Sequence, residues 1–339
     1  MRKRPPSFAV RLPDPDHPVP AIEAVPDDPS RPFWSVMIPT YNCARFLPEA
    51  LHSVLEQDCG PSAMQIEVID DASTDDPEDV VDKLGGGRVT FFRQPVNRGA
   101  VANFNACLAR SRGHLVHILH GDDLVAPGFF RTMAQLAERW PDTALLACRT
   151  LVIGETGLLL SVTPRIVPCE QPGHDAGPLL FTNPFTFNAV VVRRRFYEAF
   201  GGFDLRLPHT ADWEMWVRAF VEGGGVMTPE PLAYYRVFEG NDTSRLRRTG
   251  ENLRDFLRYG EIVRQRVPRF DTRSFRAHVA AQAMEQARLF RSLGDAAAER
   301  ANEGVWREAV TTGMILRRAA RSVFDTLRDL RRKIAGGAS

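Results

Sequence analysis

Side chains that could bind a nucleotide and a metal ion follow four hydrophobic segments of the chain. The first segment ends in PTYN (39–42) and the second in DD (70–71). An arginine at position 98 follows the third segment, and the fourth runs into HGDD (120–123). The tyrosine ring could stack on a base, an aspartate could accept the N3–H of uracil or thymine, and the arginine could meet a phosphate. Paired carboxylates suit Mg²⁺ or Mn²⁺, which bind oxygen ligands beside substrate phosphates.

The elements that must position these side chains alternate between strands and helices. Runs rich in β-branched residues predict strands over 35–39, 66–70, 88–92 and 114–119. Helical spacing between them predicts helices over 48–57, 77–84 and 100–111. This order is typical of an α/β fold with a mainly parallel sheet and helices on both faces, where ligands bind beyond the carboxyl ends of the strands. We therefore expect the four polar clusters to share one edge of the sheet.

Each cluster taken alone also has a structural interpretation. Tyr41 could pack against the protein, and Asp71 and Asp123 could cap turns or helices. The coincidence of four such clusters at successive strand ends favours a binding site. The chain lacks the GxxxxGK[ST] pattern and has no GxGxxG after the first strand. These absences argue against a P-loop nucleotidase and a dinucleotide-dependent oxidoreductase.

A second candidate for chemistry lies at the start of a helix in the middle of the chain. The helix is predicted by apolar residues at i, i+3, i+4 and i+7, namely Trp213, Trp216, Val217 and Phe220. Asp212 lies at the edge of this stripe, where burial can tune a carboxylate, and is the candidate general base. Alternatively, Asp212 is only the N-cap of the helix. Glu214 lies on the opposite side, four residues before Arg218, and is expected to form a surface ion pair.

The composition indicates an ordinary globular protein. The 339 residues carry 43 basic and 42 acidic side chains, a net charge of +1, and 44% of them are apolar. This balance excludes a disordered or collagen-like chain and argues against nucleic acid as a partner. Five cysteines without a CxxC pair argue against a disulfide framework or a zinc site. No apolar run is long enough for a membrane span or a signal peptide, so we expect a cytoplasmic protein.

Five segments in order resemble one known family. They are SVMIPTYN (from 35), VIDDASTDD (from 68), NRGAVANFNACL (from 97), LHGDDLVAPGFF (from 119) and FGGFDLRLPHTADWEMWVRAF (from 200). Together they resemble the nucleotide-sugar glycosyltransferases of family 2, which have the GT-A fold. The resemblance covers about residues 33–245.

The resemblance assigns the first two strand ends to the nucleoside. It implies that Thr40, Tyr41 and Asp71 hold the nucleoside, with Pro39 and Asn42 in the same nucleotide-binding turn. Since Asp71 would accept the N3–H of the base, the donor is expected to be a UDP- or dTDP-linked sugar.

The resemblance assigns the next two strand ends to phosphate and metal. Asp122 occupies the last position of the family's Asp-x-Asp motif and would bind Mn²⁺ or Mg²⁺, with Asp123 beside it. His120 replaces the first aspartate of the motif, and a neutral imidazole can also ligate Mn²⁺. Arg98 and Arg236, the latter in YYRVFEGNDTS, would contact the phosphates.

The resemblance further implies an inverting glycosyltransferase. Asp212 matches the catalytic base, although Ala211 replaces the acidic residue that often precedes it. The acceptor, which no motif identifies, would be a glycan, a lipid-linked intermediate or a protein. The setting would be bacterial cell-surface polysaccharide or glycoconjugate synthesis. Because His120 and Ala211 depart from the family pattern, the alternative is a catalytically degenerate GT-A-fold protein that binds or scaffolds.

The chain is expected to have three parts. Residues 1–32 are rich in proline and are predicted to be a disordered leader. Residues 33–249 would form the catalytic domain, with a nucleotide-binding half (33–145) and an acceptor half (146–249). The remainder, 250–339, is predicted to be helical and basic, and its segment 314–334 is a basic amphipathic helix. This helix could lie on an anionic membrane surface, pack on the catalytic domain or join a homodimer.

Overall fold

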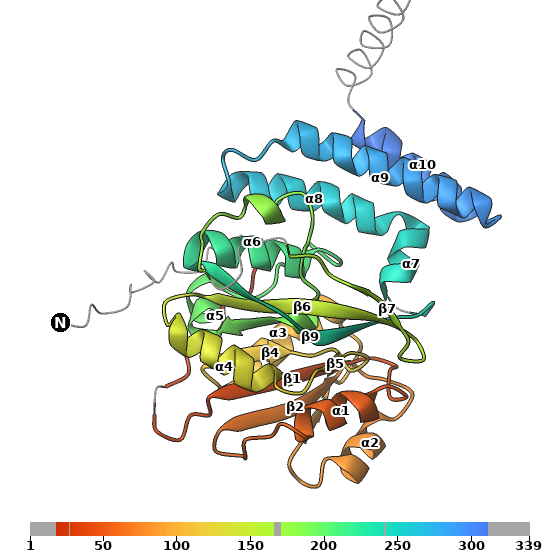
Figure 1. The fold of residues 1–339 in the computed structure, drawn as a ribbon. Coiled ribbons are helices and arrows are strands. Elements are labelled where there is room, and N and C mark those ends of the chain that lie inside the picture. Colours follow the sequence, from red (N-terminus) through yellow and green to blue (C-terminus); the bar gives the residue numbers. More distant parts are fainter. Residues whose placement is uncertain (1–17, 27, 166–170, 241, 311–339) are drawn as a thin grey trace, which may run out of the picture. The chain divides into compact units, whose positions relative to one another are not determined.

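The structure is a computed structural model that describes residues 18–26, 28–165, 171–240 and 242–310. It divides into two compact units, Met1–Asn241 and Asp242–Ser339 (Figure 1). Residues 1–17 of the expected leader and the basic segment 314–334 lie outside the described residues.

The first half of the first unit is a four-stranded parallel sheet in the order β3-β2-β1-β4. Its strands are β1 (Trp34–Thr40), β2 (Met64–Asp70), β3 (Thr90–Arg93) and β4 (Leu115–Ile118). The connecting helices are α1 (Leu47–Leu55), α2 (Pro77–Leu84) and α3 (Ala100–Arg110). All seven elements agree with the sequence prediction, because the β-branched runs and the helical spacing are both unambiguous here.

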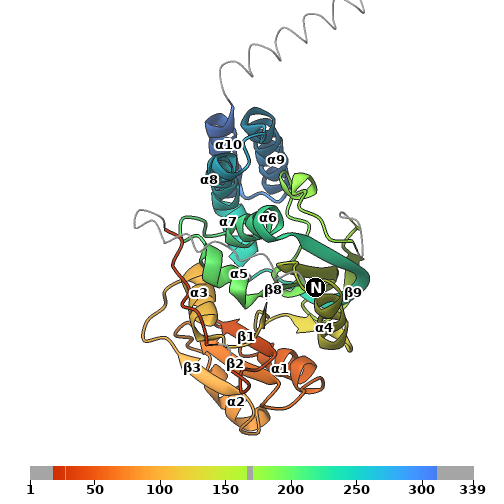
Figure 2. The same cartoon turned by 90° about the vertical axis from the view of Figure 1, so that its left-hand side faces the viewer.

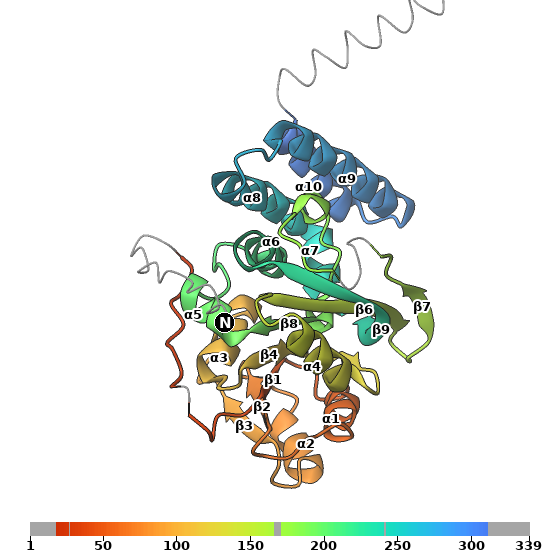
Figure 3. The same ribbon diagram turned by 60° about the vertical axis from the view of Figure 1, so that its left-hand side comes forward.

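The second half of this unit extends the sheet to nine strands. From β4 the order continues β8-β6-β9-β5, and β7 pairs with the last part of β6, on the edge of β6 that faces away from β9 (Figure 3). These strands are β5 (Leu124–Val125), β6 (Leu145–Gly154), β7 (Leu159–Val162), β8 (Val190–Arg193) and β9 (Gly225–Val237). Strand β9 runs parallel to β6, whereas β8 is antiparallel to both of its neighbours. The helices of this half are α4 (Phe129–Arg139), α5 (Arg194–Phe200), α6 (Ala211–Gly223) and the 3₁₀ turns Gly177–Leu179 and Phe187–Ala189.

The core lies between the sheet and helices on both of its faces. All seven residues of β1 are buried, as expected for a central strand that is covered on both sides. Val36 and Ile38 belong to one apolar cluster with residues of α1 and α4, including Leu51 and Phe129. Helix α3 covers the opposite face (Figure 2). The sheet therefore has a fixed edge where its parallel strands end.

The expectation that residues 1–32 lack structure is wrong for 18–26 and 28–32. Ile22 is buried, and the carbonyl of Glu23 accepts a hydrogen bond of 2.9 Å from the Arg194 guanidinium of α5. Composition predicted too few apolar contacts to order this segment. Its order instead comes from hydrogen bonds to a buried arginine, and prolines reduce the entropy that is lost on ordering.

The described part of the second unit, residues 242–310, is helical. It contains α7 (Asp242–Thr249), α8 (Glu251–Arg266), α9 (Thr272–Ser292) and α10 (Ala296–Ala309). Helix α9 is capped by Asp271, whose carboxylate accepts a bond from the Ser274 amide. The buried ring of Phe275 contacts Tyr259 of α8 at a centroid distance of 5.6 Å. Among the described helices, none is both long and apolar enough to cross a bilayer.

Replacing Ile22 by alanine tests whether the leader is part of the folded domain. We expect Ile22→Ala to lower the free energy of unfolding by about 2 kcal/mol, because a buried side chain is truncated. The control Leu84→Ala, at a half-exposed position of α2, should change it by less than about 0.5 kcal/mol. Urea unfolding followed by circular dichroism measures both. Equal effects of the two changes would mean that residues 18–32 do not contribute to the fold.

Candidate active site

The loops after β1 and β2 are joined by a network around Asn42. The Asn42 amide donates to Ser73 Oγ at 2.9 Å, and its side-chain oxygen accepts from the Thr74 amide at 2.8 Å. Asn42 has a φ of 50°, a left-handed conformation that asparagine tolerates better than most residues. Asn42, expected to belong to the nucleotide-binding turn, thus holds two loops together. The turn leaves the neighbouring Tyr41 ring half exposed, where a base could stack on it.

Pro39 and Thr40 lie beneath these loops. The Thr40 side chain is buried, and its hydroxyl donates to Asp70 Oδ1 at 3.2 Å. The Pro39 carbonyl accepts a bond from the Gly121 amide at 3.1 Å. Pro39 and Thr40 thus bond to the ends of the neighbouring strands, and their assignment to the nucleotide stays a prediction.

Asp71 joins the end of β2 to the loop before α3. Its carboxylate is buried and accepts bonds from the backbone amides of Arg98 (2.9 Å) and Gly99 (2.8 Å). A carboxylate has about four lone-pair positions, so it can also accept a bond from a ligand N–H. The Arg98 side chain is exposed at the same strand edge. The structure thus places Asp71 and Arg98 together, as the order of the strands predicts.

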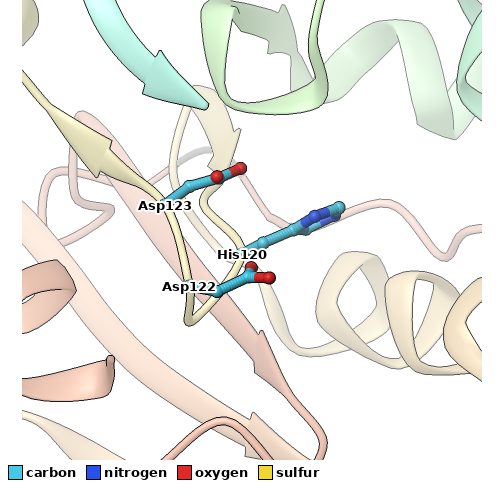
Figure 4. Close-up of side chains that lie close together, drawn as sticks. All are labelled: His120, Asp122 and Asp123. Atoms are coloured by element: carbon cyan, nitrogen blue, oxygen red, sulfur yellow. The ribbon is translucent and has the colours of Figure 1, made fainter. Parts of the chain in front are cut away.

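The loop between β4 and β5 brings three potential metal ligands together. One ligand atom each of His120, Asp122 and Asp123 lies within 4.8 Å of the others (Figure 4). The turn is tight, with the Asp123 amide donating to the His120 carbonyl at 3.0 Å. Gly121 allows this approach, because a Cβ there would lie only 2.7 Å from Thr40 Cγ2 and 2.9 Å from Cys43 Sγ.

The carboxyl group of Asp123 is buried, which makes its charged form unfavourable. Its side chain is only 1% exposed, and burial together with the charge of Asp122 raises the pKa of the Asp123 carboxyl well above its usual value. The backbone amide of Arg236 donates to Oδ1 at 2.9 Å and opposes this shift. Among the described residues, none forms a hydrogen bond with Oδ2. Two carboxylates and an imidazole with an unsatisfied oxygen fit a divalent cation such as Mn²⁺ or Mg²⁺.

Aromatic rings fix the orientation of His120. Its imidazole stacks on Phe104 of α3 at a centroid distance of 5.1 Å and contacts Phe187 at 4.8 Å. Phe187 in turn packs against Trp216 of α6 at 5.5 Å. The imidazole is therefore held beside Asp122 and Asp123 at one end of an aromatic cluster that extends to α6.

Asp212 lies in the first turn of α6. Thr210 is the N-cap residue of this helix, so the alternative that Asp212 is its N-cap is wrong. Its Oδ1 accepts the Trp213 amide at 2.7 Å, and its Oδ2 accepts the Asn183 side-chain amide at 2.9 Å. A role for Asn183 was not predicted from the sequence, where only its place before Pro184 in a loop could have indicated it. The partly exposed Asp212 carboxylate is thus oriented by two donors.

The ion pair between Glu214 and Arg218 is buried, which corrects the expectation of a surface pair. The two side chains are 2% and 1% exposed and meet at 2.8 Å. The guanidinium also donates to the carbonyls of Phe200 and Gly202. Helix α6 is buried on nearly all sides, so a polar side chain there needs partners of this kind.

The Arg236 side chain is also placed differently from the prediction. It was expected to contact phosphate, but it is buried and directs Nε to the Asp122 carbonyl (3.0 Å), Nη1 to the Glu155 carbonyl (2.8 Å) and Nη2 to Glu49 Oε2 (2.9 Å). All three guanidinium nitrogens thus bond to protein. The phosphate contact expected for Arg236 stays a prediction.

Comparison with known proteins identifies the first unit. Residues 35–194 match the family model described as Glycosyl transferase family 2. The chain contains a family 2 glycosyltransferase domain. This glycosyltransferase is 27% identical over 224 residues to the putative glycosyltransferase EpsE of Bacillus subtilis, which covers 64% of this chain and 77% of EpsE. It is 28% identical over 195 residues to a PGL/p-HBAD biosynthesis glycosyltransferase of Mycobacterium bovis, which covers 56% and 70% of the two chains.

Solved structures show that the fold is of the GT-A type. Staphylococcus aureus TarS (residues 1–349, with UDP-GlcNAc) gives a TM-score of 0.54 at 15% identity and covers 82% of this chain and 93% of its own. The mannosyltransferase PcManGT of Pyrobaculum calidifontis, in complex with GDP-Man and Mn²⁺, gives 0.53 at 17% identity, with coverage of 91% and 85%. At these identities the likeness establishes the architecture of the glycosyltransferase and nothing finer.

Replacing Arg218 of α6 tests whether its ion pair with Glu214 is buried. We expect Arg218→Met to lower the free energy of unfolding by about 3–5 kcal/mol, because Glu214 would keep a buried charge without its partner. The double variant with Glu214→Leu should recover a large part of that loss. Urea unfolding of the single and double variants measures this, and a loss below about 1 kcal/mol would contradict the burial of the pair.

Neutralising Asp123 tests whether its buried carboxyl group destabilises the loop between β4 and β5 and whether it binds a metal ion. We expect Asp123→Asn to raise the Tm of the metal-free protein by about 2–4 °C, because a carboxyl group whose charged form is destabilised by burial is replaced by a neutral amide, while Oδ1 stays available to the Arg236 amide. The same change should abolish the increase in Tm that Mn²⁺ gives the wild type. The control Asp79→Asn, at an exposed carboxylate, should respond to Mn²⁺ as the wild type does. A normal Mn²⁺ response of Asp123→Asn would exclude Asp123 as a ligand.

Proposed function

We propose that this glycosyltransferase moves a sugar from a UDP- or dTDP-linked donor to an acceptor hydroxyl, with inversion at the anomeric carbon. The observation that carries the proposal is the group of His120, Asp122 and Asp123, whose ligand atoms lie within 4.8 Å of one another. This group follows β4, next to the strand that ends at the exposed ring of Tyr41.

The donor would be held by side chains from four loops. Tyr41 stacks on the base, Asp71 accepts the base N–H, and the exposed Arg98 meets the diphosphate. Asp122 and Asp123, with the imidazole of His120, would hold Mn²⁺ or Mg²⁺, which supplies positive charge for the leaving diphosphate when bound. The nucleotide sugars named for TarS and PcManGT, and the Mn²⁺ named for PcManGT, support this arrangement.

The reaction is a single displacement. The Asp212 carboxylate takes the proton of the acceptor hydroxyl, and the freed oxygen forms a bond to the anomeric carbon. The bond from that carbon to the β-phosphate oxygen breaks, and its electron pair leaves with the nucleoside diphosphate. Because the acceptor attacks from the face opposite to the leaving group, the configuration inverts and no covalent enzyme intermediate forms. The Asn183 amide keeps one Asp212 oxygen fixed during this step.

The acceptor is proposed to be a glycan or a lipid-linked intermediate of cell-surface polysaccharide or glycoconjugate synthesis. The printed name of the PGL/p-HBAD biosynthesis glycosyltransferase supports such a setting. We place the enzyme in the cytoplasm, at the inner face of the membrane if residues 314–334 bind lipid. Alternatively, we propose that residues 314–334 join two copies of the chain in a homodimer.

Two isosteric variants distinguish the proposed metal ligand Asp122 from the proposed general base Asp212. We expect Asp122→Asn and Asp212→Asn each to lower turnover at least about 100-fold, because one loses a cation ligand and the other loses the base. Binding of UDP in the presence of Mn²⁺ should weaken in Asp122→Asn and survive in Asp212→Asn. Release of nucleoside diphosphate from a panel of nucleotide sugars measures turnover, and calorimetry measures binding.

The matched control is Asp204→Asn, a buried carboxylate that pairs with Arg206 and to which we assign no part in the reaction. Near-normal turnover of purified Asp212→Asn would overturn the assignment of the base. A wild type that releases no nucleoside diphosphate from any donor would favour the degenerate binding protein instead.

A further inference from the structure

Arg236 forms hydrogen bonds with Asp122 and Asp123, the two aspartates of the loop between β4 and β5. Its backbone amide donates to Asp123 Oδ1 at 2.9 Å, and its Nε donates to the main-chain carbonyl of Asp122 at 3.0 Å. The residue lies near the end of β9, which pairs with β5 directly after the loop. One residue therefore fixes the side chain of one aspartate and the backbone of the other.

Three further contacts leave the guanidinium little freedom. Nη1 donates to the Glu155 carbonyl at 2.8 Å, Nη2 donates to Glu49 Oε2 at 2.9 Å, and the group lies 4.7 Å from the centroid of the Phe46 ring. The Arg236 side chain is 1% exposed, whereas that of Glu49 is 55% exposed. A buried guanidinium is stable only with its donors satisfied, so turning it toward a ligand would break several bonds at once.

We infer that Arg236 is a positioning residue that holds Asp122 and Asp123 in the geometry that binds the cation, and that it does not contact the diphosphate. The inference rests on the proposed function of the same loop. The planar fork of arginine suits the task, because it reaches three acceptors in fixed directions, which a lysine ammonium cannot do. Residues that orient metal ligands typically change metal affinity about 10–100-fold when they are replaced.

The two roles of Arg236 predict different binding data. A positioning residue affects Mn²⁺ binding by the protein alone and leaves metal-free UDP binding unchanged. A phosphate ligand does the reverse, and its charge is partly restored by lysine. We therefore propose titrating Mn²⁺ alone into each protein, followed by the electron paramagnetic resonance of free Mn²⁺, and titrating UDP in EDTA by calorimetry.

For Arg236→Lys we expect the Kd for Mn²⁺ to rise about 10–100-fold, with metal-free UDP affinity within about twofold of the wild type. Turnover should recover toward the wild-type value at saturating Mn²⁺, which a general loss of folding would not allow. The matched control is Arg45→Gln, since Arg45 also lies over the Phe46 ring, at 4.3 Å, but is exposed and bonds to Glu155 instead of the loop. This control should bind Mn²⁺ as the wild type does.

Glu49→Gln gives a second test that does not disturb a buried residue. Loss of the charged partner loosens Arg236, so we expect the Kd for Mn²⁺ to rise about two- to tenfold. If Arg236 were a phosphate ligand held back by Glu49, the same change would instead tighten metal-free UDP binding. The two roles thus predict effects on different ligands and of opposite sign.

The outcomes separate this inference from the proposed function. If the wild type binds Mn²⁺ and the Arg236→Lys and Glu49→Gln proteins bind it equally well, the positioning role is wrong and the cation site stands. Weakened metal-free UDP binding in Arg236→Lys would also overturn it. A wild type that binds no Mn²⁺ would overturn both proposals.

Discussion

Two carboxylates on consecutive residues, one of them fully buried, repel each other and lose hydration in the folded chain. Asp122 and Asp123 are in this position, and surrounding residues reduce the repulsion between their carboxylates. An amide and a guanidinium from Arg236 offset part of the negative charge, and Gly121 allows the tight turn that keeps the carboxylates together. A divalent cation would remove the remaining repulsion.

The acceptor side of the site depends on the same core. The aromatic contacts from His120 through Phe187 to Trp216 connect the loop between β4 and β5 to α6. Close-packed rings fix distances between elements better than long side chains do. Together with the buried pair of Glu214 and Arg218, this packing explains why a carboxylate on α6 can hold a fixed position relative to the loop after β4.

The elements of the donor side could be predicted from the sequence because each has a strong local period. The polar residues at the strand ends followed from the rule that parallel strands end at one edge. Which of those residues face a ligand could not be predicted, because burial depends on partners that are distant in sequence. Thr40 bonds to Asp70 at the end of β2, Asn42 bonds to the loop that follows, and Arg236 bonds to Glu49, 187 positions away. The spacing of Glu214 and Arg218 predicted the pair but not its burial, and Glu23 accepts a bond from Arg194, also far along the chain.

The central claim is that the loop after β4 binds a cation that bridges to the diphosphate of the donor. A crystal structure with UDP and Mn²⁺, with the ion located by its anomalous scattering, tests it most directly. The account predicts one Mn²⁺ coordinated by carboxylate oxygens of Asp122 and Asp123 and by both phosphates, with His120 beside it and the base against Tyr41. Manganese bound elsewhere, or UDP bound against Tyr41 with no ion at this loop, would contradict it.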